Sequence, residues 1–276
     1  MKMTLGFSPC PNDTFIFDAL VNKKIDTEGL EFELYLEDVQ TLNQWALENK
    51  LEVSKISYGV YPLLLDKWHL LDSGGALGKG VGPLLISNRP MPDSNFNKLK
   101  VAIPGKNTTA HVLFSLAFPD FPNKEFMIFS AIEEAILQER VDCGVIIHEN
   151  RFTYQEKGLL KWMDLGAYWE SRTGLPIPLG GIVIRKTIDP AIREKLNRLI
   201  RKSIEYAFAN YPQLGSFVKE NSQEMEESVM RQHIDLYVNN YSLSLGEDGE
   251  KAVDFFVKIF QEMNKPNAQP FSLAGR

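Results

Sequence analysis

The feature that most constrains this chain is an alternation of short apolar runs with helix-like segments, which is interrupted once and then begins again. The strand-like runs MTLGF (residues 3–7) and LEFELYLED (residues 30–38) are each followed by a segment with helical signals. The segment NRPMPDSNFNK (residues 88–98) breaks the alternation with prolines and polar residues, and the same order then resumes. The pattern predicts an α/β fold with largely parallel sheets.

The break and a later return divide the chain into two predicted lobes. A further strand is expected at LGGIVIRK (residues 179–186), and the sequence beyond it is almost entirely helical. We therefore expect residues 1–90 and 183–276 to form a discontinuous first lobe, and residues 91–182 to form the second. Ligands of open α/β folds bind where strands end and helices begin, so the cleft between the lobes is the expected site.

Composition excludes several classes of protein. The 276 residues are 44% hydrophobic and 24% charged, which is typical of a globular protein with ample core. The net charge of −6 and the absence of a basic run argue against a nucleic-acid partner. No stretch of 18 apolar residues occurs and the N-terminus has no secretory pattern, so we expect no membrane span and a cytoplasmic location.

The cysteines and histidines predict no metal site. The two cysteines, Cys10 and Cys143, are too few for a disulfide framework or a structural zinc site. One disulfide stays open as an alternative to two free thiols in a reducing cytosol. The four histidines are far apart and form no HExxH motif. The glycine-rich segment SGGALGKGVGP (residues 73–83) lacks the spacing of a phosphate-binding loop, and we expect a turn near the cleft there.

The turn between the first strand and the first helix, SPCPND (residues 8–13), is a candidate binding element. Asn12 or Asp13 is expected to cap the helix, whose free N–H groups would point into the cleft. The alternative is that Pro9 and Pro11 only stiffen a turn and Asn12 only caps. The position at the end of a strand favours a ligand contact from Asn12 and Asp13.

Two further loops repeat this arrangement. In GKNTTA (residues 105–110), Thr108 and Thr109 place two hydroxyls at a predicted helix start, although an ordinary threonine cap would look the same. In SKISYG (residues 54–59), Ser57 follows a strand toward the cleft, and Lys55 could offset the charge of a ligand anion.

His148 is the candidate base. It directly follows the apolar strand VDCGVII, so it should face the cleft. An imidazole, with its ordinary pKa near ~6.5, can accept a proton at neutral pH. The competing interpretation is a hydrogen-bonded structural histidine. Glu149 would need a strongly raised pKa to act as the base, so we do not assign it that role.

Helix signals mark several elements. Asp189 and Pro190 form a cap and first-turn pair for a long helix, and Thr41 with Gln44 forms a predicted capping box. The last helix carries an apolar stripe of three phenylalanines, Phe255, Phe256 and Phe260. The stripe is typical of core packing, and a homodimer contact is the alternative.

Five segments together resemble the 1,4-dihydroxy-6-naphthoate synthase family of the futalosine-type menaquinone pathway. They are SPCPNDTFIF, SKISYG, GKNTTA, GVIIHENRFTY and GLPIPLGGIVIRK, and they occur in order from residue 8 to residue 186. The resemblance implies a fold like that of type II periplasmic binding proteins, with a ligand cleft between two lobes. It implies that cyclic dehypoxanthinyl futalosine is the small-molecule substrate and that no metal or organic cofactor takes part. A histidine base carries over onto His148, and the substrate-holding loops carry over onto Lys55, Ile56, Ser57, Thr108 and Thr109.

Two other functions stay open on the same fold. One is a non-catalytic solute-binding protein for a small carboxylate, since fold alone does not decide function. The other is a chorismate dehydratase-like enzyme of the same pathway, which would also need proton transfer. An interaction protein with an inactive site is a third and weaker alternative. Turnover of the substrate distinguishes them from the naphthoate synthase.

Overall fold

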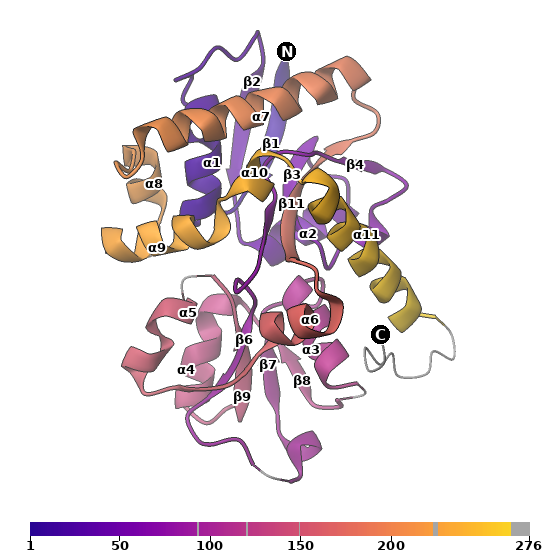
Figure 1. Cartoon of the computed structure of the whole chain (residues 1–276), viewed down its shortest axis with the longest axis vertical. Helices are drawn as coiled ribbons and strands as arrows, with labels where there is room; N and C mark the ends of the chain where they lie inside the picture. The colour runs from indigo at the N-terminus through magenta and orange to yellow at the C-terminus, as the bar shows by residue number, and fades with distance from the viewer. Residues whose placement is uncertain (93, 120, 149, 223–225, 266–276) are drawn as a thin grey trace.

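The computed structural model describes residues 1–92, 94–119, 121–148, 150–222 and 226–265, and its strands form two separate sheets (Figure 1). The first sheet has the order β2-β1-β3-β11-β4, with β5 also paired to β11, and the second has the order β10-β6-β9-β7-β8. The first sheet contains β1 (Lys2–Phe7), β2 (Glu31–Leu36), β3 (Val53–Ser57), β4 (Trp68–Leu70), β5 (Ala76–Gly78) and β11 (Ile177–Arg185). The second contains β6 (Leu84–Ser87), β7 (Val101–Ile103), β8 (Lys124–Phe126), β9 (Cys143–Ile146) and β10 (Leu160–Asp164).

Helices flank both sheets. Within the first lobe α1 packs against α7, α8 and α9, and Figure 1 shows α7 running along the outer end of that lobe. The helices are α1 (Pro11–Val21), α2 (Val39–Leu47), α3 (Thr109–Ala117), α4 (Ile132–Leu137), α5 (Asn150–Thr153), α6 (Leu165–Thr173), α7 (Pro190–Asn210), α8 (Ser216–Asn221), α9 (Glu227–Tyr237), α10 (Asn240–Leu243) and α11 (Gly246–Met263). Short 3-10 turns lie at Tyr61–Leu63, Phe96–Lys98, Phe129–Ala131 and Tyr154–Lys157.

The prediction of an α/β fold with two lobes is confirmed, but the prediction of mainly parallel sheets is wrong. β1 is parallel to β2 and β3, and β7 is parallel to β8 and β9. β11 is antiparallel to β3, β4 and β5, while β6 is antiparallel to β9 and β10. The reason is topological. β1, β3 and β9 run toward the cleft, whereas β6 and β11 each begin at the cleft, where the chain crosses from one lobe to the other.

Sheet pairing places the crossings earlier in the sequence than residues 90 and 183. β6 already belongs to the second sheet, so the first crossing falls within residues 79–83. β11 belongs to the first sheet from Ile177 onward, so the return falls within residues 174–176. We propose these two segments as the lobe boundaries. The glycine-rich segment expected to be a turn in fact contains β5, which pairs with β11.

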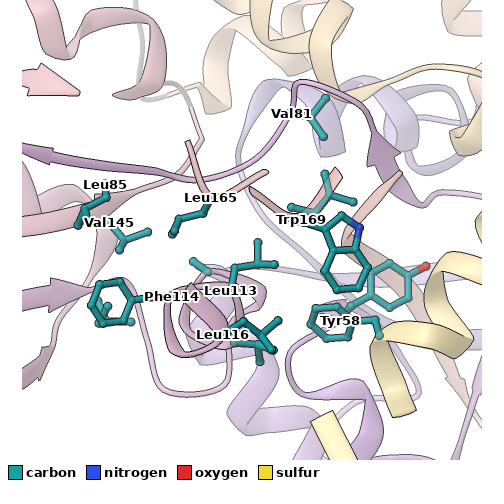
Figure 2. Close-up of a cluster of buried hydrophobic side chains, with 14 of the residues drawn as sticks. Tyr58, Val81, Leu85, Leu113, Phe114, Leu116, Val145, Leu165 and Trp169 are labelled. Atoms are coloured by element: carbon teal, nitrogen blue, oxygen red, sulfur yellow. The ribbon is translucent and has the colours of Figure 1, made fainter. Parts of the chain in front are cut away.

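One apolar cluster joins the two lobes on one side of the cleft (Figure 2). Figure 2 shows Tyr58 after β3, Leu113 of α3 and Trp169 of α6 in this cluster. Phe256 of α11 belongs to the same cluster. Trp169 is fully buried, its indole N–H donates to the Pro176 carbonyl oxygen at 3.1 Å, and its ring centroid lies 5.7 Å from that of Phe256. The other two phenylalanines of the last-helix stripe, Phe255 and Phe260, pack against the same cluster. The stripe therefore contributes to the core of this chain.

Of the two helix caps predicted for α7 and α2, the structure has the first but not the second. The Asp189 carboxylate accepts a hydrogen bond from the backbone N–H of Ala191 at 2.8 Å, which confirms the predicted start of α7. The predicted capping box of Thr41 and Gln44 is wrong, because α2 begins at Val39 and Asp38 caps it. Asp38 directly precedes the first helical residue, so its carboxylate reaches the free N–H groups, whereas Thr41 already lies inside the helix.

The α7 cap gives a measurable stability prediction. We expect Asp189→Ala to lower the free energy of unfolding by about 1 kcal/mol, because it removes the side-chain acceptor of an otherwise unpaired helix N–H. Urea denaturation followed by circular dichroism measures it. Asp66→Ala is the matched control, since Asp66 is exposed and caps no helix. Equal midpoints for both variants would contradict the cap assignment.

Candidate functional site

A cavity lies where strands of both sheets end and helices of both lobes begin, and its empty space, including the part that is open solvent, is about 680 Å³. It is lined from the first lobe by the β1–α1 turn and the end of β3, and from the second by the start of α3 and the residues after β9. All eight residues that the sequence singled out line this cavity: Asn12, Asp13, Lys55, Ile56, Ser57, Thr108, Thr109 and His148. The structure therefore brings the predicted residues together, and their roles remain proposals.

A buried ion pair lines the cavity on the side of the first lobe. The Lys55 ammonium lies 2.9 Å from Oδ1 of Asp13, and the two side chains are 6% and 2% exposed. Lys55 also donates to the carbonyl oxygen of Gly74 at 3.1 Å. The other Asp13 oxygen, Oδ2, accepts from the hydroxyl of Ser8 at 2.8 Å and from its backbone N–H at 3.2 Å. Each charge is thus paired and hydrogen-bonded, as buried charges require.

Asn12 and Asp13 do not cap α1 as the sequence led us to expect. The helix begins at Pro11, with Cys10 at the N-cap position and no side-chain cap hydrogen bond, so both residues lie in the first turn. Asn12 donates its amide N–H to Oδ1 of Asp13 at 2.9 Å. Its own carbonyl oxygen, Oδ1, is buried without a hydrogen-bond partner. Because Asn12 lines the cavity, a donor on a bound ligand would satisfy that oxygen.

Hydroxyl groups from the two lobes meet on the opposite wall. The Ser57 hydroxyl oxygen accepts from the backbone N–H of Thr109 at 2.7 Å and lies 3.1 Å from the Thr109 hydroxyl. The Thr109 hydroxyl donates to the Leu179 carbonyl oxygen at 3.0 Å. Thr108 caps α3 through a hydrogen bond from the backbone N–H of His111 at 3.2 Å, so the ordinary threonine cap that the sequence left open as an alternative is present. Polar groups of β3, α3 and β11 are held together here.

α2 supports this wall from behind. The side-chain oxygen of Asn43 accepts from the backbone N–H of Ser57 at 2.8 Å, and its amide N–H donates to the carbonyl oxygen of Asn107 at 2.9 Å. Gln40 accepts from the backbone N–H of Asn107 at 3.2 Å. Asn43 is fully buried and ties the end of β3 in the first lobe to the loop before α3 in the second. The lobes are therefore linked by hydrogen bonds as well as by the apolar cluster.

His148 reaches the cavity from the second lobe. It lies two residues after the end of β9 and has a left-handed backbone, with φ of 57°. Its Nδ1 lies 3.7 Å from the sulfur of Cys10, and its ring packs edge-on to Phe129 with centroids 4.8 Å apart. A non-glycine residue with positive φ is uncommon, and such strained backbone gathers at functional sites. Glu149, which we did not assign as the base, lies outside the described residues.

α9 adds two aromatic rings that the sequence analysis did not single out. His233 is fully buried, with its ring centroid 6.2 Å from that of His148 and 4.7 Å from that of Tyr237. Tyr237 lines the cavity. Burial, and after it the charge of His148, lowers the pKa of His233 well below its usual range. His233 is therefore held neutral beside the candidate base.

Other lining residues carried no sequence signal. Leu179 and Gly180 contribute from β11, and Ala110 from α3. Val39 lines the cavity from the first turn of α2. These are ordinary core residues by type, and only the meeting of the two lobes places them around one cavity. The Cys10–His148 contact was also unforeseen, although the position of Cys10 at a helix start beside a cleft was visible.

Close backbone contact between the lobes makes Gly59 sensitive to substitution. A β-carbon at residue 59 would lie 2.3 Å from the carbonyl carbon of Thr108, which no real contact allows. We expect Gly59→Ala to displace the loop before α3, to lower the free energy of unfolding by about 1–3 kcal/mol and to weaken ligand binding at the Ser57–Thr109 wall. Thermal unfolding and ligand titration measure both effects. Wild-type behaviour in both would show that the lobes are farther apart in solution.

The described part of the chain contains neither a membrane-spanning helix nor a cluster of metal-ligating side chains. No helix in it is long and apolar enough to cross a membrane. Nor does this part contain a group of three or more histidine, cysteine, aspartate or glutamate side chains that could hold a metal ion. Cys10 and Cys143 are buried and form no disulfide with each other, so the alternative of one disulfide is not realised.

The chain is similar to known proteins over nearly its whole length. Residues 3–262 match the model of a family described as menaquinone biosynthesis. A Thermus thermophilus protein named 1,4-dihydroxy-6-naphtoate synthase is 44% identical over 260 residues, which cover 94% of this chain and 93% of that protein.

Two solved structures resemble the fold. A protein of Archaeoglobus fulgidus has a TM-score of 0.89 at 32% identity, covering 94% of this chain and 97% of that one. A Candida albicans protein described as having the generic periplasmic binding protein fold has a TM-score of 0.69 at 11% identity, with 97% and 92% covered. The second likeness concerns the fold alone, and it confirms the predicted periplasmic-binding-protein-like architecture.

Proposed function

Because this chain belongs to the menaquinone biosynthesis family, we propose that it is a carbon–carbon lyase that converts cyclic dehypoxanthinyl futalosine to 1,4-dihydroxy-6-naphthoate. The 44% identity to a protein named for that product, extending over nearly all of both chains, supports the choice of reaction. The observation that carries the proposal is the position of His148, which lines the same cavity as polar residues of the opposite lobe.

The reaction sets three requirements that the cavity residues can meet. A base must take a proton from the substrate, a carbon–carbon bond must break, and the new ring becomes aromatic, which supplies driving force. Neutral imidazole suits the first step at ambient pH, and we assign it to His148. Developing negative charge on substrate oxygens needs donors, and we assign that role to the N-terminal end of α3, where Ala110 lines the cavity. None of these steps calls for a metal or an organic cofactor.

Substrate binding is assigned to the two polar walls. Ser57 and Thr109 present hydroxyls beside Ile56, whose side chain adds apolar surface. Asn12 presents an acceptor, while the Lys55–Asp13 pair holds the first turn of α1 in place and contributes a fixed dipole. Thr108 acts indirectly by capping α3. Burial of the site removes competing water, which strengthens each of these polar contacts.

Turnover of the substrate by the purified chain tests the proposal. The protein is incubated with cyclic dehypoxanthinyl futalosine, and product is followed by naphthoate absorbance and mass spectrometry. A parallel incubation with chorismate tests for loss of water. Formation of the naphthoate supports the proposal. Dehydration of chorismate alone would assign the sister activity, and thermal stabilisation by either compound without product would assign a binding protein.

A further inference from the structure

Cys10 and His148 meet across the cleft between the two lobes. Cys10 precedes α1 in the first lobe and His148 follows β9 in the second, 138 positions later in the sequence. The Cys10 sulfur lies 3.7 Å from Nδ1 of His148, which is hydrogen-bond distance for sulfur. The contact therefore exists only when the lobes are brought together as in this structure.

Cys10 does not use its side chain to cap the helix that it precedes. Cys10 occupies the N-cap position of α1, where serine, threonine, aspartate or asparagine would normally bond to the helix N–H groups. Its side chain makes no such cap hydrogen bond. Cys10 is only 5% exposed, and both Cys10 and His148 line the same small cavity. The thiol is thus directed at the imidazole rather than at its own helix.

We propose that Cys10 is a positioning residue that orients His148 and sets its tautomer, an inference that rests on the proposed role of His148 as the base. The hydrogen bond made by one ring nitrogen determines which nitrogen carries the proton. When the sulfur accepts the Nδ1–H of the neutral ring, the lone pair lies on Nε2. Nε2 then takes the proton from the substrate, and the polarisable sulfur remains against the Nδ1–H of the imidazolium.

Three other side chains near the ring are poorer candidates than the thiol for orienting it. Phe129 packs edge-on to His148 and offers no polar atom. His233 is 6.2 Å away between ring centroids, and burial keeps it neutral. Asp38 also lines the small cavity, but its carboxylate already accepts from the backbone N–H groups at the start of α2. The sulfur thus gives Nδ1 a partner that these three side chains do not.

The first test needs no substrate, so it is independent of the proposed function. The chain has two cysteines, and Cys143 is fully buried, with burial raising its pKa to about 12. In the Cys143→Ala background, alkylation by iodoacetamide reports on Cys10 alone. A thiol beside an imidazole at a helix start is more reactive than an isolated one. We expect His148→Asn to slow alkylation of Cys10 at pH 7 by about tenfold. An unchanged or faster rate would overturn the contact.

The second test measures positioning through kinetics. We expect Cys10→Ala to lower kcat by about 10-fold to 100-fold with KM within about twofold of wild type, as when a partner that orients a functional histidine is removed. The pH dependence of kcat should also change, which loss of structure alone would not produce. Cys10→Ser keeps a polar partner and should recover part of kcat, while its hydroxyl can cap α1 and preserve the fold. Cys143→Ala is the control and should retain wild-type kcat.

The outcomes separate the two proposals. A Cys10→Ala variant with wild-type kcat and wild-type pH dependence would overturn the positioning role. The role would also be overturned if kcat in Cys10→Ala and Cys10→Ser fell only in proportion to a fall in Tm. If the wild-type protein makes no naphthoate, the proposed function fails. In that case the alkylation rates still decide whether Cys10 and His148 are paired.

Discussion

Replacement of His148 by asparagine is expected to reduce kcat for naphthoate formation by about 10²–10⁴-fold. This is the range by which a positioned general base contributes to a reaction. Asparagine suits the test because it tolerates the left-handed backbone that His148 adopts, with φ of 57°. The side chain then lacks a group that takes a proton at neutral pH. Stopped assays with cyclic dehypoxanthinyl futalosine, followed by mass spectrometry of the product, measure the loss.

The control separates loss of the base from loss of the fold. His69→Gln removes another histidine, which is exposed on β4 of the first sheet and does not line the site cavity, and it should retain wild-type kcat. His148→Asn should still be thermally stabilised by the substrate, because the binding walls are intact. A loss of only a few-fold in kcat would refute the assignment of His148 as the base.

The second large effect concerns stability and follows from the buried ion pair. We expect Lys55→Met to lower the free energy of unfolding by about 3–5 kcal/mol, since it leaves the Asp13 carboxylate buried without its positive partner. The hydrogen bonds from Ser8 and Asn12 to Asp13 remain but do not neutralise the charge. Urea denaturation at constant pH measures the change. Ligand binding should weaken as well, because the pair holds the first turn of α1 against the cavity.

Two comparisons identify the cause of that loss. The double variant Asp13→Asn with Lys55→Met removes both charges, so it should recover part of the stability lost in Lys55→Met. Lys2→Met breaks an exposed pair with Glu33 and should stay close to wild type. If Lys55→Met were no less stable than Lys2→Met, the Lys55–Asp13 pair would not be buried in solution.

The site was accessible from sequence because strand ends and helix starts are local signals. Polar residues directly after apolar strands marked Ser57 and His148, and a polar turn before a helix marked Asn12 and Asp13. In an open α/β fold such positions converge at one edge of each sheet. Facing the two edges toward each other is enough to place all eight predicted residues around one cavity.

Details that depend on geometry between distant residues were not accessible. Asn12 and Asp13 were expected to cap α1, but the pull of Lys55 and Ser8 on Asp13 directs its carboxylate away from the helix N–H groups. His233 is fully buried beside His148 through the packing of α9, a helix more than 75 residues farther along the chain. Both contacts join residues that are far apart in the sequence, so the periodicity and spacing of short segments do not predict them.

The sequence by itself determined the α/β class, the two lobes and the edges at which polar residues gather, because each follows from periodicity and chain order within a few residues. The tertiary structure decided the antiparallel direction of β6 and β11, the Lys55–Asp13 pair and the Cys10–His148 contact. Each of these depends on where the chain re-enters a lobe or on how close the lobes approach. Such quantities arise from packing between segments far apart in sequence, where burial and charge pairing outweigh local propensity.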